Sequence, residues 1–254
     1  MRKVGAGSHN MAGVDTAMKP IGYYTDNNVS QGVMRAFAAS GIETRHIKDF
    51  DNTQPAIFYG ILRGAGIAMR ILKDRGIDFW YVDNGYFDAV YMGEGKRKEM
   101  HGKYRVVKND YITPLPAEGY YSAHGAKYPM RVLMMPPSVY TAFMHDTTPE
   151  DWRITWGQRI HDLGYSRKLR DKEEKTPLDT ELADCDAVFA FNSMAVVRAA
   201  QLGKFVYTTH GIVRNADYLG RICPTYDIEE LKRFYEPKQF TLEQIADLGV
   251  RCLN

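Results

Sequence analysis

Hydrophobic residues in the first half of the chain form short β-rich runs that alternate with segments of helical spacing. Strands are predicted at residues 20–25, 42–47, 56–60 and 77–82, and helices at 31–40 and 64–74. The runs at 56–60 and 77–82 are apolar at nearly every position, as expected for strands buried on both faces. Such alternation is typical of parallel strands joined by crossover helices. The pattern therefore predicts a parallel sheet in this half.

The same alternation resumes near residue 129, after an irregular segment. Strands are predicted at 129–135, 187–191 and 205–209, a charged strand and loop at 166–175, and helices at 149–163, 178–183, 194–202, 229–235 and 242–248. We therefore expect an α/β fold of two minimal Rossmann-like domains facing across a cleft, where small-molecule sites are common. The predicted N-terminal, acceptor-side domain is 19–126, and the predicted C-terminal, nucleotide-sugar-binding domain with its closing helices is 127–254. A single continuous sheet is the alternative.

Composition narrows the class of protein without naming a function. The chain has 254 residues, 44% of them hydrophobic and 25% charged, which is typical of a globular protein. It has no run of eighteen uncharged apolar residues, so we expect a soluble protein with no membrane partner. The three cysteines are widely spaced, which argues against a disulfide framework and favours a reducing cytoplasm.

Basic residues are concentrated in the irregular segment, which we predict to be a basic loop at 93–126. Seven cationic or titratable side chains fall within thirteen positions: Lys96, Arg97, Lys98, His101, Lys103, Arg105 and Lys108. With Tyr104 among them, they suit the phosphates and bases of a nucleic acid. A lid over any anionic acceptor is an equal alternative. Lys103 and Arg105 are the substrate-binding candidates of this segment.

The most informative stretch is the predicted strand 187–191, which is followed by Asn192, Ser193 and a helix. A helix that begins there directs free backbone N–H groups and its positive end toward two short hydrogen-bonding side chains. This favours a phosphate site, and simple helix capping is the alternative. The preceding segment supplies cations for a diphosphate, and a solvated charged face is the alternative. The candidates there are Lys168, Arg170 and Lys172.

Asp83 follows the predicted strand 77–82 and is our candidate for a catalytic carboxylate. Open α/β sheets bind ligands at the carboxyl ends of their strands. The alternative is a turn, because Asp-Asn-Gly is a strong turn sequence and residues 87–91 could form the second strand of a hairpin. Arg63 and Gly64 follow another buried strand and are predicted to bind substrate. Among the histidines in predicted loops, His145 is the catalytic candidate.

Three features together resemble the GT-B glycosyltransferases, and more narrowly the capsule polysaccharide biosynthesis family that includes the retaining Kdo transferases. They are the acid-X-Gly-aromatic motif at 83–87, the Asn192-Ser193 unit with its Gly-Lys-Phe-Val continuation at 203–206, and the terminal helix sequence at 239–249. A Gly-Lys-Tyr-Arg-Val-Val stretch at 102–107 resembles small phage-type relatives. Arg198 departs from the family, which usually has a Glu for the donor ribose at that place.

The resemblance implies a metal-independent transferase that moves a sugar from a nucleotide-sugar donor to a hydroxyl acceptor. It implies donor contacts at Thr209 and His210, and substrate contacts at Asn84 and Tyr86 beside Asp83. A hydroxylated base in phage DNA is one candidate acceptor, which would place the protein in the host cytoplasm and require an exposed or flipped base. The rival functions are a sugar-nucleotide epimerase or hydrolase and a non-catalytic nucleic-acid-binding module. Oligomeric state is not indicated.

Overall fold

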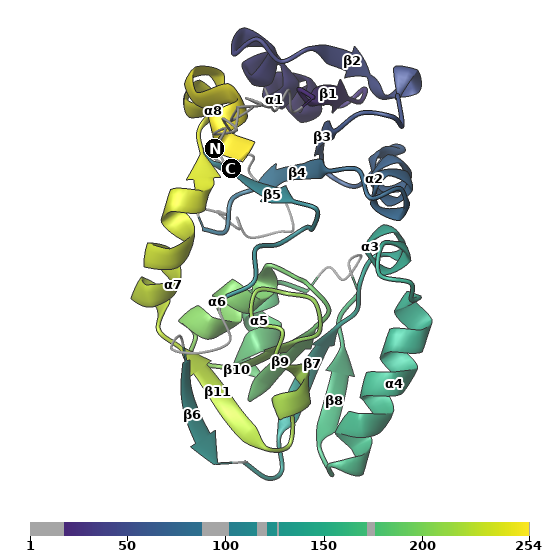
Figure 1. The fold of residues 1–254 in the computed structure, drawn as a ribbon. Helices are drawn as coiled ribbons and strands as arrows, with labels where there is room; N and C mark the ends of the chain where they lie inside the picture. The colour runs from purple at the N-terminus through teal and green to yellow at the C-terminus, as the bar shows by residue number, and fades with distance from the viewer. Residues whose placement is uncertain (1–17, 88–101, 116–120, 126, 172–175, 254) are drawn as a thin grey trace, which may run out of the picture.

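The computed structural model describes residues 18–87, 102–115, 121–125, 127–171 and 176–253. Its described part is a mixed α/β fold with two separate sheets, one mostly and one entirely of parallel pairs, plus a two-stranded antiparallel ribbon. In Figure 1 the six-stranded sheet lies at the top and the four-stranded sheet at the bottom. No helix within the described ranges is long and apolar enough to cross a membrane.

The six-stranded sheet has the strand order β12-β5-β4-β3-β1-β2. Its strands are β1 (Ile21–Tyr24), β2 (Thr44–His46), β3 (Ala56–Tyr59), β4 (Phe79–Asn84), β5 (Tyr104–Lys108) and β12 (Gln239–Phe240). Strands β1 to β4 are mutually parallel, whereas β5 and β12 pair antiparallel at one edge. The helices that flank this sheet are α1 (Asn28–Ala39), α2 (Ala65–Asp74) and α8 (Leu242–Leu248).

Each face of this sheet is covered by a hydrophobic cluster. One cluster joins strand residues such as Tyr23 and Phe58 to Met69 and Leu72 of α2. The other joins Ile57 and its neighbours to residues of α1 and α8. A sheet covered on both faces needs apolar residues at successive positions, which explains the unbroken apolar runs in the sequence.

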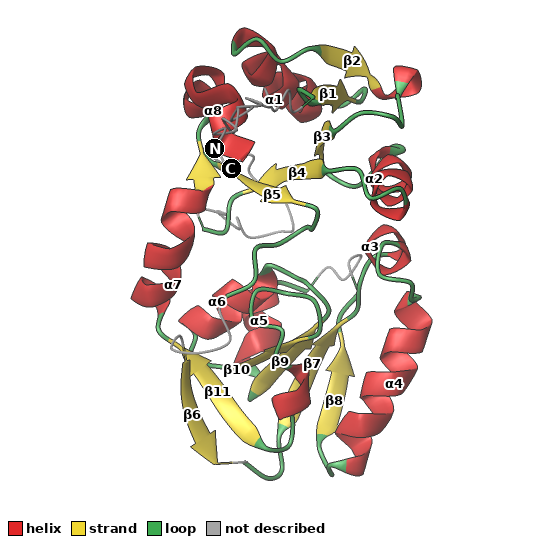
Figure 2. Ribbon diagram, viewed as in Figure 1, coloured by secondary structure: helices red, strands yellow, loops and turns green. Residues whose placement is uncertain are grey.

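The four-stranded sheet is parallel throughout and has the order β10-β9-β7-β8. Its strands are β7 (Arg131–Met135), β8 (Ser166–Leu169), β9 (Ala187–Ala190) and β10 (Phe205–Thr208), and the ribbon pairs β6 (Tyr121–Gly125) with β11 (Ile222–Tyr226). The helices of this half are α3 (Val139–Phe143), α4 (Pro149–Asp162), α5 (Leu178–Ala183), α6 (Ala195–Gln201) and α7 (Ile228–Tyr235). Figure 2 shows this alternation of helices and strands.

The predicted parallel sheets and most element positions are confirmed. Side-chain capping at helix N-termini explains where several helices begin. The Thr148 side chain accepts from Asp151 N at the start of α4, with Pro149 in its first turn. Thr241 and Gln244 form the expected capping box of α8. Helix α1 begins three residues earlier than predicted, because the Asn27 side chain accepts from Val29 N and Ser30 N.

Two local expectations differ from the structure. Residues 104–108 of the predicted basic loop form strand β5, because their backbone pairs with β4 and Val107 is buried. Asp83 and Asn84 lie inside β4 instead of after it, since β5 extends the pairing to Asn84. The antiparallel neighbour of β4 is therefore β5, and the predicted hairpin partner at 87–91 falls mostly outside the described residues.

The end of the described chain returns to the first sheet. Strand β12 pairs with β5, helix α8 packs on α1, and Trp80 Nε1 donates to Leu253 O at 2.7 Å. Figure 1 shows α7 running between the two sheets on the way to this edge. Our predicted boundary placed these residues with the second half, and the structure places them against the first.

Candidate active site

A pocket of about 380 Å³ lies at the carboxyl edge of the four-stranded sheet. All four strands are parallel, so the loops that follow β7, β9 and β10 open on the same side, where ligands bind in such sheets. The pocket is lined by His145, Thr147, Asp151, Trp152, Thr155, Trp156, Phe191, Thr209, His210, Arg214, Ala216 and Asp217. Three predicted site residues therefore meet in one place: His145, Thr209 and His210.

The loop after β10 is held by buried side-chain hydrogen bonds. The Thr208 Oγ1 accepts from Gly211 N at 3.1 Å and from Arg214 N at 3.2 Å. Asn215 accepts from Thr208 N at 3.0 Å and donates to Val206 O at 2.9 Å. At Gly211 a Cβ would lie 2.6 Å from the Thr208 Oγ1, so only glycine fits. These bonds fix the backbone that presents His210 and Arg214 to the pocket.

His145 and His210 form an imidazole pair on the pocket wall. Their ring centroids are 4.3 Å apart, and the His210 ring also stacks on Phe191 at 4.3 Å. The Nδ1 of His210 is buried and has no hydrogen-bond partner among the described residues. A buried polar atom without a partner is costly, so this nitrogen is a natural contact point for a ligand or water.

Burial lowers the pKa of both imidazoles and so favours their neutral forms. Burial, followed by the neighbouring His210, lowers the pKa of His145 to about 4. Burial and the Arg214 charge lower the pKa of His210 as well. A neutral imidazole has one unprotonated ring nitrogen, so each ring offers a lone pair to a ligand hydroxyl at neutral pH, and the low pKa makes His145 a weak base.

Several lining residues were not among the sequence candidates. Trp152 Nε1 donates to Thr209 Oγ1 at 3.2 Å, and Trp156 lies one turn further along α4. Arg214 forms an ion pair with Asp110, which joins the loop after β10 to the segment that follows β5. Trp152 and Trp156 lie far from the predicted motifs in sequence, whereas Arg214 follows the predicted His210 by four positions. The sequence feature that could have pointed to this wall of the pocket is the pair of tryptophans four positions apart, which lie on one face of a helix.

Asp83 and Arg105 form a second cluster, at the carboxyl end of β4. Arg105 donates to Asp83 Oδ2 at 2.9 Å, to Asn84 O at 2.6 Å and to Tyr111 O at 3.2 Å. Tyr81 OH donates to the same Asp83 oxygen at 2.7 Å, and burial raises the Tyr81 pKa well above its usual value. The Arg105 side chain is only 6% exposed. Asp83 therefore has a structural role, whatever its part in catalysis.

The other substrate candidates surround this cluster or lie apart from it. Tyr86 is buried, stacks on Tyr235 at 4.0 Å and accepts from Thr113 N, so its ring and hydroxyl serve packing. Lys103 pairs with Glu236. Arg63 and Gly64 lie in the exposed turn before α2, both with positive φ.

Two predicted phosphate-binding cations, Lys168 on β8 and Arg170 just after it, are held by a buried carboxylate. Lys168 Nζ lies 3.1 Å from Glu181 Oε1, and Arg170 pairs with Glu181 Oε2. The Glu181 side chain is fully buried, so it needs both cations. Lys168 remains 57% exposed, whereas Arg170 is mostly covered. Lys172 lies outside the described residues.

Asn192 and Ser193 lie, half-buried, between Phe191 of the pocket wall and helix α6. The Ser193 Oγ accepts from Ala195 N at 3.2 Å, so the hydroxyl helps to begin α6. The capping alternative thus accounts for the Ser193 hydroxyl. The predicted phosphate contact of this pair stays a prediction.

The described residues provide no unpaired cations of the basic segment for a nucleic acid and no cluster for a metal ion. The described part of the basic segment contributes three cations, and each has an acidic partner: Lys103 with Glu236, Arg105 with Asp83, and Lys108 with Asp78. Lys96, Arg97, Lys98 and His101 lie outside the described residues. Within the described ranges, no group of three or more His, Cys, Asp or Glu side chains is placed to hold a metal ion.

No protein-family model matches the chain, and no curated protein matches it. Among solved structures, the chain is similar to KpsC of Thermosulfurimonas dismutans, a beta Kdo 2,4 transferase, with 11% sequence identity and a TM-score of 0.43. The alignment covers 84% of this chain and 88% of that chain.

Proposed function

We propose that this protein is a glycosyltransferase that moves a sugar from a nucleotide-sugar donor to a hydroxyl acceptor. The observation that carries the proposal is the neutral His145–His210 pair in a pocket at the carboxyl edge of a parallel sheet. A sugar hydroxyl must lose its proton during transfer, and a neutral imidazole is suited to take it. The motifs at Asp83 and at Asn192-Ser193, which resemble GT-B enzymes, point to the same class.

In the proposed reaction, His145 takes the proton of the acceptor hydroxyl, and the acceptor oxygen forms a bond to the anomeric carbon of the donor sugar. The bond from that carbon to the phosphate oxygen breaks, and the nucleotide leaves with the electron pair. Arg214 at the pocket wall supplies positive charge for the departing diphosphate. His210, through its unpartnered Nδ1, binds the donor or the acceptor.

The two sheets would then divide the work, as in a two-domain GT-B arrangement. We assign the donor to the four-stranded sheet, because its carboxyl edge has the pocket, Asn192-Ser193 and the partly exposed Lys168. The six-stranded sheet would present the acceptor. A saccharide and a hydroxylated DNA base both remain candidate acceptors.

The test is thermal denaturation of the full chain with a panel of nucleoside diphosphates, CMP and their sugar conjugates. Binding to the folded state raises the melting temperature, by an amount that grows with the logarithm of ligand concentration over Kd. We expect one nucleotide to stabilise the wild type and Arg214→Gln to lose most of that shift. Arg198→Gln is the matched control, since Arg198 has similar exposure and also forms one ion pair with an aspartate, Asp179.

Product analysis then separates the rival functions. Transfer requires both donor and acceptor, so the donor should be consumed only when a saccharide or a hydroxymethylated DNA is added. Consumption of the sugar nucleotide without acceptor would favour the epimerase or hydrolase. If DNA alone stabilised the protein and every nucleotide failed, the glycosyltransferase proposal would be wrong and the binding-module alternative would replace it.

A further inference from the structure

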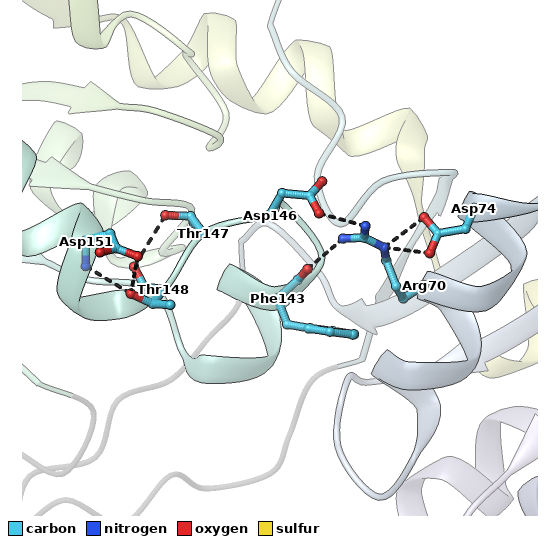
Figure 3. Close-up of a pocket in the computed structure, with 7 residues that line it drawn as sticks. All are labelled: Arg70, Asp74, Phe143, Asp146, Thr147, Thr148 and Asp151. Atoms are coloured by element: carbon cyan, nitrogen blue, oxygen red, sulfur yellow. Dashed lines mark hydrogen bonds and ion pairs between the residues drawn. The ribbon is translucent and has the colours of Figure 1, made fainter.

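Helix α2, which flanks the first sheet, contacts the C-terminal end of helix α3. Helix α3 ends at Phe143, and His145 follows two positions later. Arg70 Nη1 donates to Phe143 O at 2.9 Å, and Lys73 Nζ donates to Met144 O at 2.8 Å. Figure 3 shows the Arg70 guanidinium between Asp74 of its own helix and Asp146 beyond α3. The last carbonyl groups of a helix have no hydrogen-bond donor within the helix, and these two side chains supply the donors.

The backbone around His145 is a tight helix-ending turn. Thr147 N donates to Ala142 O at 3.2 Å, and Asp146 has a φ of +54°. This pattern is a Schellman-type ending, in which glycine is the favoured residue at the position with positive φ. Here the position is occupied by aspartate, whose Oδ1 lies 2.7 Å from Arg70 Nη2. The side chain that makes the turn less favourable is thus the one that binds α2.

The same segment is anchored by a buried side chain. Met144 is 2% exposed and packs in the hydrophobic cluster of the first sheet, with Met69 and Leu72 of α2 and with Tyr111. The residue next to it, His145, belongs to the pocket of the second sheet and contacts Tyr111, at 5.9 Å between ring centroids. One short turn therefore connects the core of one half to the site of the other.

We propose that Arg70 and Lys73 are positioning residues for His145: they bind the carbonyl groups of Phe143 and Met144, and so fix the turn that presents the imidazole to the pocket. The inference deepens the proposed function, since it matters for catalysis only if His145 acts as the base. Its structural part stands independently of the reaction. Arg70, Phe143 and Asp146 also line a pocket of about 390 Å³, so the contacts between α2 and this turn form part of its wall.

The charges around His145 give the proposal a specific signature. Four titratable or charged groups from three segments act on the ring: Lys73 from α2, Asp110 from the segment after β5, and His210 and Arg214 from the loop after β10. Burial and His210 lower the His145 pKa most, Asp110 opposes them, and Lys73 and Arg214 lower it further. Removal of the Lys73 charge should therefore raise the His145 pKa as well as loosen the turn.

The experiment is an NMR titration of the His145 Cε1–H resonance in the full chain, assigned with His145→Gln. We expect Lys73→Met to raise the His145 pKa, and Arg70→Ala to shift the amide resonances of 143–148. Lys73→Arg should restore the wild-type pKa. Arg75→Gln is the control, because Arg75 lies at the same end of α2 but binds Asn52 instead of α3.

A second variant guards against simple unfolding. Asp146→Gly suits the positive φ and removes only the ion pair to Arg70, so it should retain the fold while it shifts the His145 resonance. In a transfer assay, Arg70→Ala should lower kcat about tenfold with little change in KM, since misplaced catalytic groups affect the chemical step. If the His145 resonance and pKa were unchanged in Arg70→Ala and Lys73→Met, the positioning role would be wrong. If the His145 resonance shifted in Arg70→Ala and Asp146→Gly, which keep the Lys73 charge, while the wild type transferred no sugar, the positioning role would stand and the proposed function would fail.

Discussion

Polar site candidates lie at the carboxyl edges of both sheets, but the two edges differ in whether the polar atoms of those residues have hydrogen-bond partners. At the edge of β4, Asp83 accepts from Tyr81, Asn84 N and Arg105, and Arg105 in turn makes hydrogen bonds to two backbone carbonyls. At the edge of β9 and β10, the His210 Nδ1 has no partner among the described residues, and the imidazoles line an open pocket. The hydrogen bonds at the first edge hold its strands and loops together, and we call this edge the brace. The second edge has polar atoms left to bind a ligand.

A distinctive sequence motif therefore need not contain the side chains that are free to bind a ligand. Asp-X-Gly-Tyr-Phe is the more distinctive sequence, yet its carboxylate and tyrosine are bound within the protein. His210 belongs to no strong motif, yet it has an unused nitrogen. The Asp83 carboxylate has hydrogen-bond donors from Tyr81, Asn84 N and Arg105, whereas the unpartnered buried nitrogen of His210 needs a compensating role.

The largest expected effect is on activity, at the open edge. His145→Gln removes the proposed base, and we expect transfer to fall about 10²–10⁴-fold. Its matched control is His124→Gln, because His124 is an exposed histidine on the ribbon, away from the pocket. Initial rates measured at saturating donor would decide the matter. A decrease of equal size in both variants would show that the assay reports stability and not catalysis.

The next effect is on stability, at the braced edge. Arg105→Met leaves Asp83 without its cation and two carbonyls without their donor, so we expect the unfolding free energy to fall by about 3 kcal/mol. Lys108→Gln is the control on the same strand, where the half-exposed ion pair with Asp78 is worth at most about 1 kcal/mol. Urea denaturation distinguishes these values. Equal midpoints for the two variants would contradict the brace.

A smaller effect should appear as pH is lowered. The folded pKa of His145, about 4, lies below the ordinary 6.5, so the unfolded chain binds more protons between these values. Stability should therefore be constant above pH 6.5 on account of this group and fall between pH 6.5 and 4. His145→Gln should flatten that part of the curve. A variant that kept the full wild-type slope would place the titrating group elsewhere.

The smallest effect concerns Ser193, where capping and ligand binding can be separated. Loss of its hydrogen bond from Ala195 N in Ser193→Ala should cost at most about 1 kcal/mol. If Ser193 also binds phosphate, the nucleotide-induced rise in melting temperature should decrease as well. A normal nucleotide shift in a slightly less stable variant would reduce Ser193 to a structural residue.

Much of the fold was predictable from local patterns. The unbroken apolar run at 187–191 gave β9, and the Thr241–Gln244 capping box gave the start of α8. Strand β5 was missed because lysine and arginine suggested a loop, although Tyr104 and Val107 are buried in it. A basic residue can lie in a buried strand if its partner is present, and Asp83 is 22 positions away in sequence.

The candidate site was only partly predictable, because it depends on contacts between distant segments. His145, Thr209 and His210 were selected from loops that follow strands, and the parallel topology brings such loops together. Arg214 and Trp152 have no local signal for the pocket, since their positions follow from how the loop after β10 packs against α4. The pairing of Lys168 and Arg170 with Glu181 could not be seen from their charge pattern alone.

The return of the chain to the first sheet also constrains how the protein is made. Strand β5 ends at Lys108, and its outer neighbour β12 begins only at Gln239, roughly 130 residues later. At about 5–20 residues per second, synthesis of that interval takes roughly 7–26 seconds. During this time the nascent first sheet lacks α8 and has β5 as an unpaired edge, which is the kind of edge that pairs with other chains. The protein should therefore depend most on chaperones before its second half has left the ribosome.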